Sequence, residues 1–181
     1  MLPIRPKPTV RYNYTDFITV IPNVLGHAQI KRLRDYMHSD ISGIHRRGSK
    51  DKNTNASFNT CQVHPLNDEL YGILDHLWTP YTEINFIEPY ELKEYIEGDE
   101  FDYHVDTYIN LYEKIERKMN LIIQLSDSNE YEGGDLVVGD YTCSRQLGDC
   151  IIFPACLHHA VKNIVSGTRY SLIGHGWGPY I

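Results

Sequence analysis

Apolar residues recur at helical spacing in two places in the first half of the chain. The first series, with charged residues between its members, consists of Ile30, Leu33, Met37 and Ile41. A second series of the same kind runs through residues 70–84, and Pro80 falls inside it. Both series predict amphipathic helices. Because proline cannot continue a helix, we expect the second one to end or kink near Trp78.

The segment between these two series is polar. Residues 43–60 are rich in Gly, Ser and Asn, and a group of basic residues lies in their middle at Arg46, Arg47, Lys50 and Lys52. This composition predicts a mobile, solvated loop. The alternative is a lid that closes over a binding site.

From about residue 84 the pattern changes to short β-rich runs separated by turn signals such as Gly98-Asp99 and Ser166-Gly167. The runs are residues 90–96, 103–111, 120–125, 136–138, 150–153, 159–164 and 170–173. Many short strands with no helix between them predict a sandwich or jelly roll rather than an α/β sheet. We therefore expect a mainly β fold preceded by helices, which is an α+β arrangement.

Length and composition limit the organisation and the partners of the chain. The 181 residues predict a single domain (1–181), with an N-terminal arm and supporting helices in residues 1–84 and the β core in 85–181. With 17 basic and 24 acidic residues, the formal charge is −7, which argues against a nucleic-acid partner. No segment is apolar enough to cross a membrane or to act as a signal peptide, and the four cysteines form no CxxC pair. We therefore expect a cytoplasmic protein.

The first candidate for chemistry is His104-Val105-Asp106. Residues i and i+2 of a strand point to the same face, so one imidazole and one carboxylate would project together. The alternative is a surface histidine beside a surface aspartate.

The second candidate is the adjacent pair His158 and His159. Neighbouring strand residues face opposite ways, so only one of these histidines can face the interior. Together with His104 and Asp106, that histidine would complete a set of two imidazoles and one carboxylate. Such a set occupies one face of an octahedral metal and leaves the other face open, as in non-haem Fe(II) oxygenases.

The third candidate is Arg169, with Ser171 on the same face of the predicted strand. A planar guanidinium in an apolar pocket needs an anionic partner, and a dicarboxylate cosubstrate would supply one through a bidentate contact. The alternative is a surface arginine that pairs with a neighbouring acidic residue.

The order and spacing of these motifs resemble a known family. Residues 95–107, 122–127, 131–136, 148–154, 159–161 and 167–172 look like the successive motifs of the 2-oxoglutarate and Fe(II)-dependent dioxygenases. The branch that they resemble is the prolyl 4-hydroxylase-like one of bacterial and phage type, over residues 90–177. Gln124 and His175 depart from that pattern, because related enzymes tend to have Tyr and Trp there. We interpret His175 as a structural histidine, or as a residue that contacts the substrate or a metal ligand.

The resemblance implies a double-stranded β-helix (jelly-roll) core and assigns roles to individual residues. The implied Fe(II) ligands are His104, Asp106 and His159, and the implied 2-oxoglutarate-binding residues are Arg169, Ser171 and Tyr95. His159 rather than His158 occupies the family's ligand position before Ala-Val. Tyr95 has an equal alternative, a tightly packed strand aromatic.

The activity that the resemblance implies is hydroxylation of a substrate C–H with O2 and 2-oxoglutarate, giving succinate and CO2. A prolyl residue in a peptide or protein is the first expectation for the substrate, and ascorbate is a candidate reductant. The alternatives are an oxygenase acting on a free amino acid or another small molecule, and a non-catalytic jelly-roll binding module. A zinc hydrolase with the same ligands is a further alternative, but it would need a nearby general base.

Overall fold

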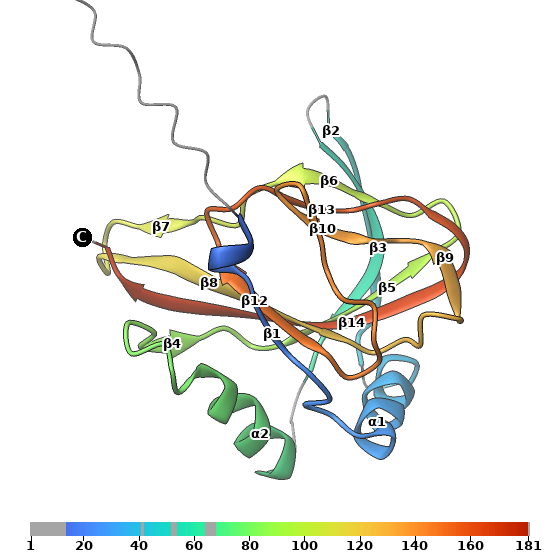
Figure 1. The fold of residues 1–181 in the computed structure, drawn as a ribbon, viewed down its shortest axis with the longest axis horizontal. Helices are drawn as coiled ribbons and strands as arrows, with labels where there is room; N and C mark the ends of the chain where they lie inside the picture. Colours follow the sequence, from blue (N-terminus) through green and yellow to red (C-terminus); the bar gives the residue numbers. More distant parts are fainter. Residues whose placement is uncertain (1–13, 41, 52–53, 64–67, 181) are drawn as a thin grey trace, which may run out of the picture.

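The fold is a curled antiparallel β-sheet with two helices packed against one side (Figure 1). The computed structural model describes residues 14–40, 42–51, 54–63 and 68–180, so the start of the N-terminal arm and Ile41 lie outside the described residues. The helices are η1 (Tyr14–Phe17), α1 (His27–Met37) and α2 (Asp68–Trp78). The strands up to β7 are β1 (Thr19–Ile21), β2 (His45–Asp51), β3 (Thr54–Gln62), β4 (Phe86–Ile87), β5 (Glu91–Ile96), β6 (Phe101–His104) and β7 (Ile109–Asn110). The remaining strands are β8 (Ile115–Gln124), β9 (Tyr131–Gly133), β10 (Leu136–Val138), β11 (Tyr141–Thr142), β12 (Cys150–Pro154), β13 (His159–Val161) and β14 (Ile164–Pro179).

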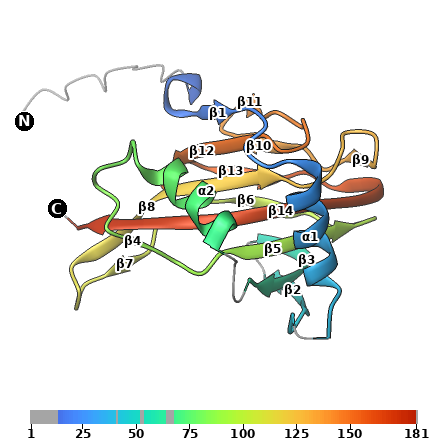
Figure 2. The same ribbon diagram turned by 90° about the horizontal axis from the view of Figure 1, so that it is seen from below.

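The sheet folds over itself into two layers. Its strands follow the order β1-β12-β8-β14-β5-β3-β6-β13-β10-β11, and β3 joins the larger layer to the smaller one because it pairs with both β5 and β6. Figures 1 and 2 show the smaller layer of β6, β13 and β10 lying over the larger layer of β12, β8, β14 and β5. This arrangement confirms the prediction of a mainly β jelly-roll core with helices before it.

Both predicted helices cover the outer face of the larger layer (Figure 1). Helix α1 buries Ile30, Leu33 and Met37, and these side chains share one apolar cluster with Leu74 of α2 and Leu172 of β14. Helix α2 ends at Trp78, as the following Pro80 predicts. Neither of the described helices is long and apolar enough to cross a membrane.

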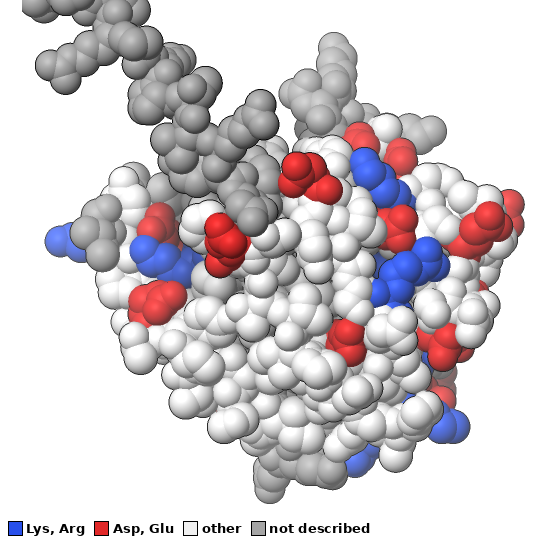
Figure 3. Space-filling model, viewed as in Figure 1, with Lys and Arg blue, Asp and Glu red and all other residues white. Residues whose placement is uncertain are grey.

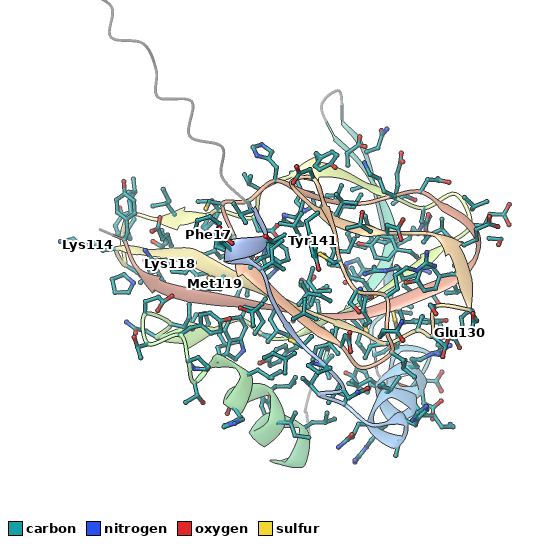
Figure 4. The ribbon with its side chains drawn as sticks, in the orientation of Figure 1. Phe17, Lys114, Lys118, Met119, Glu130 and Tyr141 are labelled. Atoms are coloured by element: carbon teal, nitrogen blue, oxygen red, sulfur yellow. The ribbon has the colours of Figure 1, made fainter. Side chains whose placement is uncertain are left out.

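A second apolar cluster fills the space between the two layers. Among its members are Phe58, Tyr95, Ile122, Leu136 and Phe153, all of them buried. Figure 4 shows how side chains crowd both faces of the larger layer, including β8, where Met119 is labelled. The residues that carry the chemistry described below lie in this inner space.

The prediction of a loop at residues 43–60 is wrong for the described part of that segment, and the alternative of a lid stays a prediction. Strands β2 and β3 form a hairpin there, and β3 continues into the larger layer by pairing with β5. Ala56, Phe58 and Thr60 are buried at alternate positions of β3. The sequence hides this alternation because only two of the three inward positions, Ala56 and Phe58, are apolar. The sheet therefore begins before residue 85.

Three predictions within the β region are also corrected. The run 103–111 is not one strand, because β6 ends at His104 and β7 begins at Ile109. The run 159–164 is not one strand either, because β13 ends at Val161 and β14 begins at Ile164. The turn predicted at Ser166-Gly167 lies inside the long strand β14, where Gly167 has φ of +80° and the register with β9 shifts between Ile164 and Ser166 without ending the strand.

Charged side chains of both signs are interleaved on the surface. Figure 3 shows basic and acidic groups next to one another at several places on one face. Examples of surface ion pairs are Arg34 with Glu130 at 2.9 Å and Arg145 with Asp135 at 3.2 Å. On the face that Figure 3 shows, the acidic residues are spread out rather than gathered in one place.

Candidate metal and cosubstrate site

The three predicted metal ligands converge at one end of the space between the layers. His104 is the last residue of β6 and His159 the first of β13, and the two lie opposite each other where these strands pair. Asp106 follows two residues after β6 and reaches both imidazoles. Its Oδ2 lies 3.1 Å from His159 Nε2, and its Oδ1 lies 3.7 Å from His104 Nε2. One ligand atom from each residue lies within 4.8 Å of the others, so the three side chains form a compact group.

Backbone contacts orient both imidazoles for metal binding. His104 Nδ1 lies 2.7 Å from the carbonyl of Asp102, and His159 Nδ1 lies 3.0 Å from the carbonyl of Leu157. A carbonyl can only accept, so each Nδ1 carries the hydrogen and each Nε2 is left with its lone pair. Burial lowers the pKa of His104 to about 4, so this imidazole is neutral at neutral pH. Both rings are therefore prepared to act as ligands.

The adjacent histidines differ in exposure. His159, the first residue of β13, is buried at 4% exposure, while His158, which precedes the strand, is exposed. Asp106 lies beyond the end of β6, and its backbone N–H donates to the carbonyl of Ala155 at 2.9 Å. That bond, rather than a continuing strand, holds Asp106 near His159. Burial alone would raise the pKa of Asp106, but the neighbouring imidazoles of His159, His175 and His104 outweigh it and keep the pKa below its ordinary value.

Two further residues form a chain of hydrogen bonds that ends at Asp106. Asn120 Nδ2 donates to Asp106 Oδ2 at 2.9 Å, and His175 Nδ1 lies 2.9 Å from Asn120 Oδ1. The amide oxygen only accepts, so His175 donates through Nδ1. Burial lowers the pKa of His175 to about 3, which keeps this ring neutral. His175 is thus a satisfied buried histidine that also holds Asn120 against the carboxylate.

We expect Asn120→Leu to weaken divalent-metal binding by about 10- to 100-fold, because Asp106 would lose the donor that fixes its orientation. Titration of the metal-free protein with Mn(II) measures this directly. Asn163→Leu, at an exposed asparagine, is the matched control and should bind Mn(II) as the wild type does. Unchanged Mn(II) affinity in Asn120→Leu would show that Asp106 does not depend on this contact.

Arg169 and Ser171 lie on the inner face of β14, and both are buried at 1% exposure. Arg169 Nη2 donates to Gln124 Oε1 at 3.1 Å, but Arg169 Nε and Ser171 Oγ have no hydrogen-bond partner among the described residues. No ion pair of Arg169 is found within that part of the chain. The surface alternative for Arg169 is therefore wrong. A buried guanidinium and a buried hydroxyl with unused donors are features of a site for an anionic ligand.

Tyr95 is both tightly packed and close to Arg169. Its ring is 1% exposed, lies 5.2 Å from the ring of Phe58, and is 5.5 Å from Arg169 Cζ. Gln124, which the sequence singled out only as a departure from the family pattern, supplies the amide oxygen that Arg169 contacts. It does so because it lies opposite Ser171 in the pairing of β8 with β14.

One cavity contains both the metal ligands and Arg169. Apolar side chains of Ile122, Leu136 and Ile173 form part of its wall. Lys93 and Asn120 also line it, and sequence reasoning singled out neither residue. For Lys93 one signal was present, since it lies two residues before Tyr95 in a predicted strand and so shares its face. Two imidazoles with one carboxylate suit Fe(II), and the unpartnered donors suit a carboxylate ligand.

Comparison with known proteins agrees with this site. A family model described as the 2OG-Fe(II) oxygenase superfamily matches residues 90–177. A PKHD-type hydroxylase of Acinetobacter baumannii is 29% identical over 167 residues, which cover 83% of this chain and 74% of that protein.

Two solved structures show the same fold at low sequence identity. A viral collagen prolyl hydroxylase from Paramecium Bursaria Chlorella virus-1, in complex with 2OG, superimposes with a TM-score of 0.68 and 14% identity. That comparison covers 90% of this chain and 96% of the viral one. A prolyl hydroxylase from Trichoplax adhaerens, in complex with a hypoxia inducible factor peptide fragment, has a TM-score of 0.70 at 14% identity, covering 91% of this chain and 84% of that chain.

The jelly roll and the convergent His-Asp-His group define a non-haem oxygenase enzyme. Over residues 90–177 the chain is similar to the 2OG-Fe(II) oxygenase superfamily, and the named hydroxylase relative supports the same class of enzyme. That family implies Fe(II) and 2-oxoglutarate for this enzyme, and the donors in its cavity fit both.

Proposed function

We propose that this enzyme is a dioxygenase that hydroxylates a C–H of its substrate, with succinate and CO2 as coproducts, and that the substrate is a prolyl residue in a peptide or protein. One observation carries the proposal. The cavity that contains His104, Asp106 and His159 also contains the buried Arg169, whose Nε has no described partner.

The proposed roles follow the chemistry of each side chain. His104, Asp106 and His159 would hold Fe(II), and Arg169, Ser171 and Tyr95 would bind 2-oxoglutarate, since all six residues line the same cavity. When bound, the iron and the cosubstrate would activate O2, with one oxygen atom going to succinate and the other to the substrate carbon.

The protein's own contribution is binding, orientation and exclusion of water. The Nδ1–H groups of the two histidines fix their rings, and Asn120 fixes Asp106. The apolar wall keeps the cavity dry, which strengthens the contact of Arg169 with a carboxylate. No side chain is required to act as a general base in this scheme.

A peptide substrate is supported by the surface beside the metal ligands. Tyr103, Val105 and Tyr108 flank His104 and Asp106 in the chain and are 45%, 41% and 61% exposed. Exposed aromatic and aliphatic side chains around a site suit contact with an extended peptide. The similar proteins named above as prolyl hydroxylases support proline as the residue that is modified.

An anaerobic titration with Fe(II) and 2-oxoglutarate, followed by visible absorption, tests the metal and cosubstrate roles. We expect a weak metal-to-ligand charge-transfer band in the wild type. The band should be absent from His159→Ala and Arg169→Ala. Absence of the band in the wild type, together with tight Zn(II) binding, would contradict the proposal and favour a hydrolase or a binding module.

The substrate class needs a separate experiment. Succinate release and oxygen incorporation by mass spectrometry would be compared for a library of proline-containing peptides and for free proline. We expect turnover with peptides only. Hydroxylation of free amino acids without any reaction of peptides would overturn the prolyl-peptide part and leave the oxygenase assignment standing.

A further inference from the structure

Lys93 occupies an unusual position for a lysine, inside the space between the two layers. In the sheet it lies opposite Thr60 of β3 on one side and opposite Ser171 of β14 on the other. Tyr95, two residues further along β5, faces the inner cluster, so Lys93 faces it as well. Lys93 is 9% exposed and lines the same cavity as the metal ligands and Arg169.

The ammonium group of Lys93 lies toward the metal end of that cavity. Its Nζ is 4.8 Å from the ring centroid of Phe58 and 5.5 Å from that of Phe101. Phe101 in turn stacks on His104, with their ring centroids 3.7 Å apart. Arg169 instead lies beside Tyr95 and Gln124. The cavity therefore has one buried cation toward the metal ligands and another at its far end.

Buried hydroxyl groups flank Lys93 on both sides. Thr60 Oγ1 and Ser171 Oγ have no hydrogen-bond partner among the described residues, and their side chains are 3% and 1% exposed. Buried polar atoms are normally hydrogen-bonded, so two unpartnered hydroxyls in one row indicate a polar ligand nearby. A cation between two such hydroxyls suits a carboxylate.

We propose that Lys93 is a second cationic contact for 2-oxoglutarate, and that it binds the carboxylate of the 2-oxo acid end while Arg169 binds the distal carboxylate. The inference rests on the proposed function, because it takes 2-oxoglutarate as the ligand of this cavity. A ligand with a carboxylate at each end matches a cavity with a buried cation toward each end. Thr60 adds a hydroxyl donor on one side of Lys93, and Ser171, which lies opposite Lys93 and two residues after Arg169 on β14, adds one between the two cations.

The test uses two ligands and two variants. Calorimetry on the Mn(II)-loaded protein would measure binding of 2-oxoglutarate and of 2-oxobutanoate, which lacks the distal carboxylate. Loss of one charge-assisted contact corresponds to about a 10- to 100-fold loss of affinity. We expect Lys93→Met to weaken both ligands to this extent, and Arg169→Leu to weaken 2-oxoglutarate far more than 2-oxobutanoate.

Controls separate a binding role from a structural one. Methionine is similar in length to lysine and can pack on the rings of Phe58 and Phe101, so Lys93→Met should keep the wild-type Mn(II) affinity and melting temperature without 2-oxoglutarate. Lys31→Met removes an exposed positive charge from α1 and should bind both ligands as the wild type does. Lys93→Arg keeps the charge and should recover part of the affinity.

Four outcomes decide between the proposal and its alternatives. A pattern in which Lys93→Met weakens both ligands supports the proposal. Unchanged affinity for both ligands in Lys93→Met overturns it, and so does a change confined to the KM of the hydroxylated substrate, which would place Lys93 on the substrate side. Failure of the wild type itself to bind 2-oxoglutarate would instead overturn the proposed function, and with it this inference.

Discussion

Replacing His159 with alanine is expected to abolish metal binding and oxygenase activity, whereas the same change at His158 should leave both near the wild-type level. The two histidines are neighbours in the chain, but only His159 faces Asp106, at 3.1 Å, while His158 is exposed. Removal of a group behind a ligand costs about 10- to 100-fold in metal affinity, so loss of a ligand itself should cost more. A matched pair one residue apart makes this the sharpest test of the site.

Mn(II) titration and succinate release would be measured for both variants under the same conditions. The ring of His159 also packs against Phe153, with centroids 5.0 Å apart, so circular dichroism and thermal melting must show that His159→Ala still folds. A result in which His158→Ala loses the metal and His159→Ala retains it would mean that β13 is turned the other way in solution. The metal site would then differ from the one described here.

The parts of the fold that the sequence predicted well are those in which one face alone is buried. Helix α1 was recognised because Ile30, Leu33 and Met37 repeat at helical spacing beside charged residues. The hairpin of β2 and β3 was missed because only Ala56 and Phe58 of the buried alternate positions of β3 are apolar, while Thr60 is polar. Hydrophobic periodicity reports a strand only when the buried positions are apolar.

The residues of the candidate site also fall into two groups, those that a sequence motif indicates and those that only strand pairing brings into the site. His104, Asp106, His159 and Arg169 could be picked out because their order and spacing along the chain resemble a family motif. Asn120 could not, because it has its place through pairing between strands, and for Lys93 the sequence offered only its position on the same strand face as Tyr95. Asn120 lies opposite His175 because β8 pairs with β14. Lys93 lies opposite Ser171 because β5 pairs with β14 on its other side. Register between distant strands is a tertiary property that local sequence patterns do not contain.

The polar residues of the cavity differ in how fully their hydrogen bonds are satisfied within the protein. The metal ligands are satisfied by backbone carbonyls and by Asn120, so their geometry exists before any ligand arrives. The end of the cavity at Arg169 is the opposite case. Arg169 keeps an unused donor there and has a neutral amide as its described side-chain partner. Such a group costs folding free energy that only an anionic ligand offsets. The metal ligands are therefore oriented before a ligand binds, whereas Arg169 lacks an anionic partner until one does.

Because Arg169 lacks an anionic partner, its replacement should change ligand affinity and thermal stability in opposite directions. Arg169→Leu should lower the affinity for 2-oxoglutarate by at least about 100-fold, since a bidentate contact comprises two charge-assisted hydrogen bonds. The same variant should melt at the same or a higher temperature than the wild type in the absence of 2-oxoglutarate, because a buried cation without a carboxylate partner is replaced by an apolar side chain. Mn(II) affinity should not change, since Arg169 contacts none of the metal ligands.

Thermal melting of the Mn(II)-loaded proteins, with and without 2-oxoglutarate, measures both effects in one experiment. Arg145→Leu is the matched control, because Arg145 is half-buried and donates to Asp135 at 3.2 Å and to the carbonyl of Tyr131 at 2.8 Å. This control should melt at a lower temperature and still be stabilised by 2-oxoglutarate, since its partners lose a donor while the cavity is untouched. If Arg169→Leu were stabilised by 2-oxoglutarate as strongly as the wild type, the cosubstrate would bind elsewhere, and the unused donor of Arg169 would need another ligand.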